Sequence, residues 1–405
     1  MIAKEILTEV IVSQREFWEK ADLGTPREKE KDILVEAGLA LLITGIRRCG
    51  KSTFLHQLFQ KHKKGYYLNL EDPRLDGFEL SDFNRIEAIL PELYGGAGTY
   101  FFDEIQIIDQ WEKFIRYLVD KKEKVVITGS NASLLSPELG TKLTGRHLPL
   151  ELFPFSYPEF LAIKKATPNL KSFEKYLDQG GFPEFLKKEN QAIHHQLLSD
   201  VIMKDIAARS GIKNISSLHK IAIYLLSNVG KEFSYNSIRK MLEIKSVQSV
   251  IDYVYYLENA YLIFTIPKFS YSYKQQVVNP KKAYSIDNGF SSSNSASFSK
   301  DKGKMLENCV FLQLRRKWKK IFYFREDNEC DFIIKEKEAV IQALQVCFDF
   351  TAENKGREIK GLLCALQQFN LARGLILTYN QEDELIIEGR KVILQPVWKW
   401  LLNRA

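Results

Sequence analysis

Eight residues from Gly45 to Ser52 combine two glycines, a lysine and a hydroxyl group at a fixed spacing. They read Gly45-Ile-Arg-Arg-Cys-Gly50-Lys51-Ser52 and fit the pattern G-x-x-x-x-G-K-[ST]. Such a loop turns its backbone N–H groups toward phosphate oxygens, and the helix after it adds the positive end of its dipole. The glycines permit the φ values and the close backbone approach that a side chain would obstruct. The pattern therefore predicts a site for a nucleoside triphosphate.

The side chains of this loop differ in their expected roles. Lys51 is expected to reach the β- and γ-phosphates, and the Ser52 hydroxyl is expected to occupy one coordination position on Mg²⁺. The predicted nucleotide-binding residues are Gly45, Ile46, Arg47, Arg48, Cys49, Gly50, Lys51, Ser52 and Thr53. The apolar run 39–44 before the loop and a helical pattern after it supply the context that the motif requires. The alternative is an ordinary strand-to-helix turn.

Two adjacent carboxylates follow a second apolar strand. The segment Thr99-Tyr-Phe-Phe-Asp103-Glu104 places both at the carboxyl end of that strand, where parallel sheets bind their ligands. Asp103 is expected to hold Mg²⁺ directly or through water. Glu104 is expected to polarise the attacking water as a general base. The alternative is a solvated acidic turn.

Two further candidates for the catalytic site come later in the chain. Ser130 and Asn131 follow the predicted strand 124–128, and either side chain would contact the γ-phosphate or position the water. The alternative for this pair is a turn and a helix cap. Arg146 is a candidate arginine finger, acting in cis or reaching a neighbouring subunit. A surface salt bridge is the alternative for Arg146.

The alternation of strands and helices from residue 39 to residue 152 predicts how these groups are positioned. Strands are predicted at 39–44, 66–70, 99–103, 124–128 and 148–152, with helices between them. This α/β pattern predicts a parallel sheet with helices on both faces, which is the P-loop fold class. A helix is predicted from Ile11 to Trp18, and Arg27 is expected on a solvated face after it.

Length and composition predict a soluble protein of two or three domains. The 405 residues are 45% hydrophobic and 27% charged, with a formal charge of +7. This mild basic excess is compatible with nucleic acid but does not require it. No apolar run is long enough to span a membrane. Five cysteines without a C-x-x-C pair argue against a zinc knuckle or a disulfide framework, so a cytoplasmic location is expected.

Residues 155–215 are predicted to form a helical linker or lid, and Gly180-Gly-Phe-Pro-Glu184 is predicted to interrupt it as a turn or hinge. Residues 216–295 are predicted to form a winged-helix-like module. Its helices are expected at 218–226, 235–242 and 247–257, and its strands at 261–267 and 275–286. If the module binds DNA, the expected contacts are Ser246, Gln248, Ser249, Asp252, Lys268, Lys274, Lys281 and Lys282. The third helix has few positive charges, so DNA and a protein partner both stay open.

Residues 296–405 show the order α-β-β-β-α-β of metal-dependent nucleases. Glu307 in the first helix and Asp331 at the start of a strand match the carboxylates of such enzymes, which gather acids and a lysine around Mg²⁺. The next strand should carry an acid and a lysine two residues apart, but it carries Gln345 and Cys347. The pattern predicts a nuclease-like domain that has lost its chemistry.

Five motifs together resemble a family of prokaryotic AAA-type ATPases with a C-terminal domain of unknown function. They are Gly45-Ile-Arg-Arg-Cys-Gly-Lys-Ser52, Asn69-Leu-Glu-Asp-Pro-Arg74, Phe101-Phe-Asp-Glu-Ile-Gln106, Thr128-Gly-Ser-Asn131 and Gly180-Gly-Phe-Pro-Glu184. The resemblance implies ATP hydrolysis with Mg²⁺, and a core in which the Asp103 strand lies beside the phosphate-loop strand. It also implies a winged-helix-like middle and a restriction-endonuclease-like C-terminal part. It supplies no physiological substrate.

The predicted domains are 1–154, the N-terminal segment and ATP-binding core, followed by 155–215, 216–295 and 296–405. The leading hypothesis is an ATPase whose nucleotide state moves a DNA- or protein-binding C-terminal half. The second hypothesis is a nucleotide-dependent switch that binds a protein partner and turns over slowly. The third is an ATP-controlled DNA nuclease. A homo-oligomer is compatible with each of them.

Overall fold

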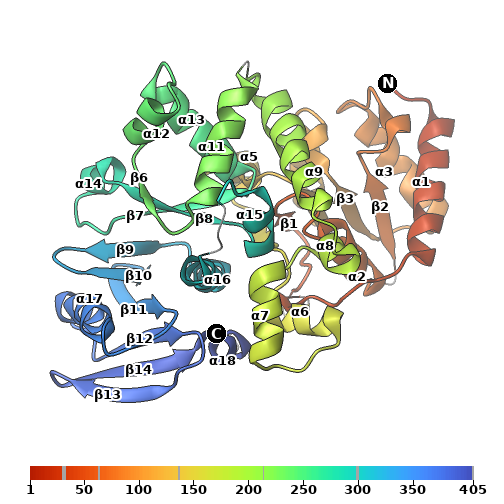
Figure 1. The fold of residues 1–405 in the computed structure, drawn as a ribbon. Coiled ribbons are helices and arrows are strands. Elements are labelled where there is room, and N and C mark those ends of the chain that lie inside the picture. Colours follow the sequence, from red (N-terminus) through yellow and green to blue (C-terminus); the bar gives the residue numbers. More distant parts are fainter. Residues whose placement is uncertain (30–32, 63, 136, 213, 298–300, 404–405) are drawn as a thin grey trace. The chain divides into compact units, whose positions relative to one another are not determined.

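Five parallel strands form the sheet of the N-terminal part in the computed structural model of the protein (Figure 1). Their order across the sheet is β2-β3-β4-β1-β5. The strands are β1 Ala40–Thr44, β2 Gly65–Asn69, β3 Thr99–Asp103, β4 Lys124–Gly129 and β5 His147–Glu151. Every residue of β1 and β3 is buried, as expected for strands covered on both faces.

The structure describes residues 1–29, 33–62, 64–135, 137–212, 214–297 and 301–403. They form two compact units, Met1–Phe153 and Pro154–Ala405. Within these described ranges, no helix is both long and apolar enough to cross a membrane.

The strand order corrects one expectation of the sequence analysis. The Asp103 strand, β3, does not lie beside the phosphate-loop strand β1, because β4 pairs with both and separates them. Thr44 pairs with Gly129, and Phe102 pairs with Ile127. All three strands run in the same direction, so their carboxyl ends still meet at one edge of the sheet. The loops that follow them can therefore form one site.

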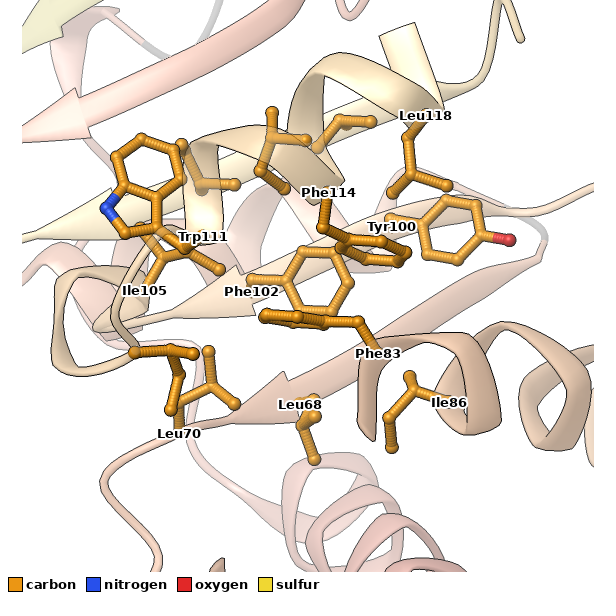
Figure 2. Packing of buried hydrophobic residues seen from close by; sticks show 14 of the residues in the cluster. Leu68, Leu70, Phe83, Ile86, Tyr100, Phe102, Ile105, Trp111, Phe114 and Leu118 are labelled. Atoms are coloured by element: carbon orange, nitrogen blue, oxygen red, sulfur yellow. The ribbon is translucent and has the colours of Figure 1, made fainter. Parts of the chain in front are cut away.

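Helices cover both faces of this sheet. They are α1 Lys4–Lys20, α2 Lys51–Gln60, α3 Asp82–Tyr94, α4 Trp111–Asp120 and α5 Pro137–Lys142. On one face, apolar side chains of α3 and α4 pack on alternate strand residues. Figure 2 shows Phe83 and Phe114 against Phe102. On the other face, Phe59 of α2 meets Phe101 edge to face. This packing holds the start of α2, and with it the phosphate loop, on the sheet.

Helices dominate the first part of the second unit. They are α6 Tyr157–Lys164, α7 Leu170–Gln179, α8 Pro183–Lys188, α9 Ala192–Asp200 and α10 Ala208–Ser210, with a π-helix at Val201–Ala207. The interruption predicted at Gly180-Gly181 is a tight junction between α7 and α8. A Cβ on Gly181 would lie 2.2 Å from the Phe155 carbonyl oxygen. The Gly181 N–H donates to the Asp287 carboxylate at 2.6 Å.

A small mixed module follows. Its elements are α11 Ile215–Ser227, β6 Glu232–Phe233, α12 Tyr235–Met241, α13 Val247–Asn259, β7 Ile263–Pro267, α14 Tyr273–Val278, β8 Lys281–Ser285 and α15 Asn288–Asn294. Its three strands form an antiparallel sheet in the order β6-β8-β7. The strand predicted at 275–286 is wrong at residues 275–278, which lie in the helix α14. The Gln276 side chain reaches back to the Ser270 carbonyl oxygen at 2.6 Å and holds this turn closed.

The last part of the chain contains a six-stranded mixed sheet in the order β13-β14-β12-β11-β10-β9. Its elements are α16 Lys302–Lys317, β9 Ile321–Arg325, β10 Glu329–Glu336, β11 Ala339–Cys347, α17 Lys355–Gln368, β12 Arg373–Thr378, β13 Asp383–Ile387, β14 Arg390–Pro396 and α18 Val397–Leu402. Helix α17 packs on one face of this sheet, with Leu362 and Leu366 in the core.

Candidate active site

The phosphate loop lies between the carboxyl end of β1 and the start of α2, and its glycines are structurally required. Gly45 has a φ of +155° and Gly50 a φ of +100°. A Cβ on Gly45 would lie 2.1 Å from the Leu152 carbonyl oxygen, a distance that no side chain can accept. Ile46 and Cys49 point into the protein and are fully buried. Only the backbone of these two residues can therefore face a phosphate.

Lys51 is the first residue of α2, and its side chain folds back over the loop. The ammonium lies 3.1 Å from the Gly45 carbonyl oxygen and 3.3 Å from that of Ile46. It also lies 3.6 Å from Glu104 Oε1. The lysine side chain is almost completely buried. A positive charge is thus held between the loop and the second of the predicted carboxylates. Ser52 and Thr53 are exposed on the first turn of the helix.

Asp103 ends β3 with its carboxylate buried beside three hydroxyl groups. Thr128 donates a hydrogen bond to Asp103 Oδ1, and the Ser52 and Tyr67 hydroxyl groups also contact the carboxylate. Burial raises the pKa of Asp103 to about 6, with help from the negative charge of Glu104. The two predicted Mg²⁺ ligands, Ser52 and Asp103, are therefore in contact. Hydroxyl and carboxylate oxygens are the donors that Mg²⁺ prefers.

Glu104 has a left-handed backbone, with a φ of +53°, and this conformation turns its side chain toward the loop. Its N–H donates to Thr128 Oγ1 at 3.0 Å. Ser130 Oγ lies 2.8 and 2.9 Å from the two carboxylate oxygens, and the Gln106 amide donates to one of them. Burial alone would raise the pKa of Glu104, but the Lys51 ammonium and these hydrogen bonds outweigh it and lower the pKa. The carboxylate is thus held ionised.

A cavity of about 600 Å³ opens beside Ser52 and Asp103. Its lining includes Trp18 of α1 and Tyr67 of β2, whose rings stack with centroids 3.4 Å apart. The cavity gives solvent and small molecules access to the metal side of the predicted site.

Three residues of the site have contacts to which the sequence analysis assigned no role. Thr128 donates to the Asp103 carboxylate and accepts the Glu104 backbone N–H, and the Gln106 amide donates to the Glu104 carboxylate. Arg27, expected on a solvated face, is buried instead. Its guanidinium donates to the Cys49 carbonyl oxygen at 3.1 Å and to the Phe153 carbonyl oxygen at 2.5 Å. Arg27 therefore supports the phosphate loop from behind.

Arg146 is not brought to this site. It directly precedes β5, and its carbonyl oxygen accepts the N–H of Ala40, the first residue of β1. The phosphate loop begins at the other end of β1, roughly 15 Å away at the usual rise per strand residue. The Arg146 side chain is half exposed and pairs with Asp120. Asn131 directly follows Ser130 and is partly buried.

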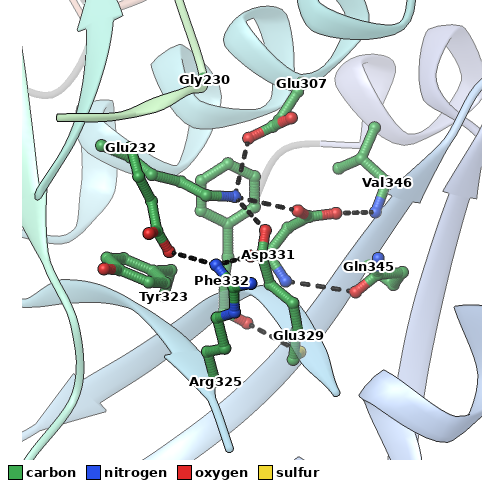
Figure 3. A network of polar contacts seen from close by, with 12 residues as sticks. Gly230, Glu232, Glu307, Tyr323, Arg325, Glu329, Asp331, Phe332, Gln345 and Val346 are labelled. Atoms are coloured by element: carbon green, nitrogen blue, oxygen red, sulfur yellow. Dashed lines mark hydrogen bonds and ion pairs between the residues drawn. The ribbon is translucent and has the colours of Figure 1, made fainter. Parts of the chain in front are cut away.

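A second polar cluster lies in the C-terminal unit (Figure 3). The Lys282 ammonium of β8 lies 3.4 Å from Glu307, 3.3 Å from Asp331 and 2.6 Å from Glu329. Lys282 is only 2% exposed, so its expected position on a DNA-facing wing is wrong. The cluster borders a cavity of about 740 Å³ that Gln345 and Cys347 also line. The ammonium of this cluster thus comes from Lys282 on the distant strand β8 and is paired with the carboxylates around it.

The charged groups of this second cluster shift each other's pKa values. Burial alone would lower the pKa of Lys282, but the carboxylates, Glu307 first, raise it well above its ordinary value. Burial would raise the pKa of Glu307, yet the Lys282 ammonium lowers it. Burial and the charge of Glu307 raise the pKa of Asp331. Gln345 accepts the Asp331 N–H at 3.1 Å and donates to Glu358 at 2.8 Å.

The motif, the strand order and the paired carboxylates define an AAA-type P-loop protein. A family model described as an AAA domain matches residues 38–161, and a domain of unknown function (DUF8612) matches residues 170–300. The chain is 34% identical to the uncharacterized protein MJ1544 of Methanocaldococcus jannaschii, over all of this chain and 97% of that protein. The chain belongs to the same protein family as MJ1544.

Two other similarities are more distant. An uncharacterized protein of Haemophilus influenzae is 29% identical over 89% of this chain and 94% of its own length. Among solved structures, the replication initiator DnaA bound to AMPPCP and single-stranded DNA is 14% identical with a TM-score of 0.30. This match covers 62% of this chain and 86% of that one. A structural likeness this weak supports no conclusion about this chain.

Proposed function

We propose that this protein binds ATP and Mg²⁺ at the phosphate loop and hydrolyses the γ-phosphate. One observation carries the proposal: Lys51, Asp103, Glu104 and Ser130 come from three separate loops and meet at one edge of the sheet. A phosphate loop alone accounts for binding. A buried carboxylate that is held ionised beside it is the group that hydrolysis needs in addition.

The donor set fits a magnesium ion. Ser52 and Asp103 offer one hydroxyl and one carboxylate oxygen in contact with each other, and they would hold the ion beside the phosphates. Once bound, Mg²⁺ would neutralise charge on the phosphate oxygens. Asp103 must be ionised to serve as a ligand, because a protonated carboxyl group is a poor donor to a cation.

The residues of this chain would act on the substrate in distinct ways. The backbone of the loop and the Lys51 ammonium would bind the phosphate oxygens. Glu104 would accept a hydrogen bond from the attacking water and orient it, and Ser130 and Gln106 would hold Glu104 in position. At present Lys51 contacts Glu104. Bound phosphate would draw the ammonium away and leave the carboxylate available to water.

Two substitutions test the proposal. Lys51→Ala should abolish ATP binding or turnover. Glu104→Gln keeps the shape of the side chain and should leave ATP binding within about threefold, while turnover falls by roughly 10²–10⁴-fold. The measurements are steady-state phosphate release and a titration with a fluorescent ATP analogue. If Glu104→Gln hydrolyses ATP at the parent rate, Glu104 is not the base. If the parent neither binds nor hydrolyses ATP with Mg²⁺, the proposal is wrong.

We further propose that residues 216–295 form a winged-helix-like module and residues 296–405 a nuclease-like domain without nuclease chemistry. The order of α11, β6, α12, α13, β7 and β8 supports the first part. The ion pairs of Lys282 with Glu307 and Asp331 support the second, because they engage the carboxylates that a metal would need. DNA and a protein partner remain the two candidate ligands of the module, with ATP turnover moving it.

A further inference from the structure

Residues 268–281, which connect β7 to β8 and include the first residue of β8, expose two aromatic rings to solvent. Tyr271 is 80% exposed and Tyr273 is 79% exposed. Val277 and Val278, on the same short helix α14, are also exposed. Single exposed apolar side chains are common on protein surfaces, but four of them within eight residues make this turn a candidate binding surface. We call residues 268–281 the tyrosine–lysine segment.

The segment is held in a defined conformation by contacts at its base. The Phe269 ring packs edge to face on Phe322 and Phe369, with centroids 5.6 and 4.8 Å away. The Phe269 N–H donates to the Tyr323 carbonyl oxygen at 2.8 Å. Ser270 Oγ donates to Gln275 at 2.8 Å. The two tyrosines are therefore displayed on a supported turn, so a ligand would pay little entropy to order them.

The positive charge of the segment indicates a negatively charged ligand. It carries Lys268, Lys274 and Lys281, and no aspartate or glutamate lies between residues 268 and 281. The Lys281 ammonium lies 3.0 Å from the Tyr235 hydroxyl, which holds it beside the turn. Aromatic rings interleaved with lysines suit a ligand that presents flat rings and negative charges in alternation. Nucleic acid has this chemistry.

The helix α13, which was expected to be the recognition helix, lacks the charges that binding to double-stranded DNA requires. Residues 247–259 contain no lysine or arginine, although phosphate contacts dominate duplex binding. Gln248, an expected base contact, donates to Asp252 at 2.8 Å. An exposed tyrosine can stack only on a base that is not already stacked on both sides. Single strands offer such bases, and base–aromatic stacking is the usual mode by which they are bound.

We propose that the tyrosine–lysine segment binds single-stranded nucleic acid, with unpaired bases stacked on Tyr271 and Tyr273 and phosphates near Lys268 and Lys274. This inference rests on the part of the proposed function in which the module binds nucleic acid. It does not depend on any residue of the phosphate loop. Loss of ATP turnover and loss of strand binding can therefore be observed separately.

The test is fluorescence anisotropy on the full chain with labelled oligo-dT and oligo-rU of about 20 nucleotides, and with a duplex of equal length. Single strands should bind more tightly than the duplex. Tyr271→Ala and Tyr273→Ala should each weaken binding by roughly 5- to 100-fold, while Tyr271→Phe should retain it because the ring remains. Lys274→Gln should lower the slope of log affinity against log salt by about 0.7. The two oligomers show whether DNA or RNA is preferred.

Two controls separate this surface from others. Tyr255→Ala removes a ring that is 55% exposed on α13 and should leave binding unchanged. Lys51→Ala should abolish ATP turnover without affecting strand binding. If Tyr255→Ala weakens binding as much as Tyr271→Ala, the helix and not the segment is the contact. If the parent does not bind either oligomer at low salt, or if the double variant Tyr271→Ala/Tyr273→Ala binds as the parent does, the proposal is overturned. A protein partner would then be the remaining candidate ligand of the tyrosine–lysine segment.

Discussion

At the scale of single residues, Thr128 links the Asp103 carboxylate to the backbone of Glu104 in the candidate site. Its hydroxyl accepts the Glu104 N–H and donates to Asp103, and the residue is fully buried. Thr128→Val removes the hydroxyl with little change of shape and leaves that N–H without its partner. We expect a loss of about 1–3 kcal/mol of stability and a fall of at least about tenfold in ATP turnover, measured by phosphate release.

Thr99→Val is the matched control for this prediction. Thr99 begins the strand that Asp103 ends, and it is also buried. Its hydroxyl contacts His62 Nδ1 at 3.2 Å, at the amino end of β3 and away from the phosphate loop. Thr99→Val should reduce the melting temperature without reducing turnover per folded chain. Equal turnover in Thr128→Val and the parent would show that the hydroxyl does not position the Asp103 carboxylate or the backbone of Glu104.

Residue type and spacing in the sequence predict the residues that carry reactive or charged groups of the site. They do not predict the residues that hold these groups in position. Lys51, Asp103 and Glu104 were predicted because each follows a recognisable strand and carries a characteristic group. Arg27 was misplaced because its partners, Cys49 and Phe153, lie 22 and 126 residues away, and no local pattern connects them. For Thr128 there was one indication in the sequence of a role in the site, because this residue lies at the end of the predicted strand that precedes Ser130.

At the scale of elements, the helix α17 contains two glycines with opposite surroundings. A Cβ on Gly361 would lie 2.0 Å from the Glu329 carbonyl oxygen, because the helix packs closely on β10, whereas a Cβ on Gly356 would meet nothing within 4 Å. Gly356→Ala should therefore raise stability by about 0.5–1 kcal/mol, the usual gain of alanine over glycine in a helix. Gly361→Ala should lower it by roughly 1–3 kcal/mol, as overpacking does.

Thermal unfolding followed by calorimetry measures this pair. The two substitutions are chemically identical and lie on one helix, so helix propensity cancels in the comparison. If Gly361→Ala stabilises the protein as much as Gly356→Ala does, then α17 does not pack on β10 as closely as described.

Asp287 joins the Gly180-Gly181 turn to α15 and should make stability depend on pH. Its carboxylate accepts the N–H groups of Gly181 and Phe290 at 2.6 and 2.8 Å. Burial nevertheless raises its pKa from 3.8 to about 6. The folded state therefore binds this proton more tightly than the unfolded state does. The resulting stabilisation is fully present below pH 3.8 and is lost as the pH rises through 6.

The variant Asp287→Asn, which does not titrate, reveals this contribution by difference. Between about pH 4 and about pH 7 the unfolding free energy of the parent should fall relative to the variant by up to about 3 kcal/mol. The measurement is the difference in melting temperature between the two proteins across that range. Other titrating groups contribute equally to both proteins. A difference that stays constant with pH would show that the pKa of Asp287 is close to its ordinary value.

Hydrophobic patterning predicted which segments of the first unit are strands and which are helices. It did not predict which strands lie next to each other in the sheet. The strand β1, predicted at 39–44, is Ala40–Thr44, because an apolar run between turns has few alternatives. The position of β4 between β1 and β3 depends on pairing between distant segments, which no periodicity reports. Val277 and Val278 favour a strand, but the segment is the helix α14, because hydrogen bonds of the Ser270 and Gln276 side chains close the turn locally.

At the scale of the whole molecule, the position of Arg146 bears on whether one chain contains every group that the proposed hydrolysis requires. Arg146 stands at the end of the sheet opposite the phosphate loop and pairs with Asp120. It lies roughly 15 Å from the phosphate loop of its own chain, farther than an arginine side chain extends. If it stabilises the transition state, it does so in a second copy of the chain, whose nucleotide site must then lie against this edge of the sheet.

A mixing experiment tests this arrangement in trans. Lys51→Ala keeps Arg146 but has no working site, and Arg146→Ala has a working site but no finger. Each variant alone should turn over ATP at least about tenfold more slowly than the parent, because arginine fingers contribute a large share of the rate. An equimolar mixture should recover part of the activity, and parental turnover per chain should rise with protein concentration.

Arg116→Ala is the control for the ion pair itself, because Arg116 contacts the same carboxylate, Asp120, at 3.8 Å. An exposed pair of this kind contributes at most about 1 kcal/mol, so Arg116→Ala should leave turnover unchanged. If Arg146→Ala behaves in the same way, and if turnover per chain does not depend on concentration, then Arg146 is only a surface ion pair. Each chain would then contain every group that hydrolysis requires, and a second copy would have no role in the chemistry.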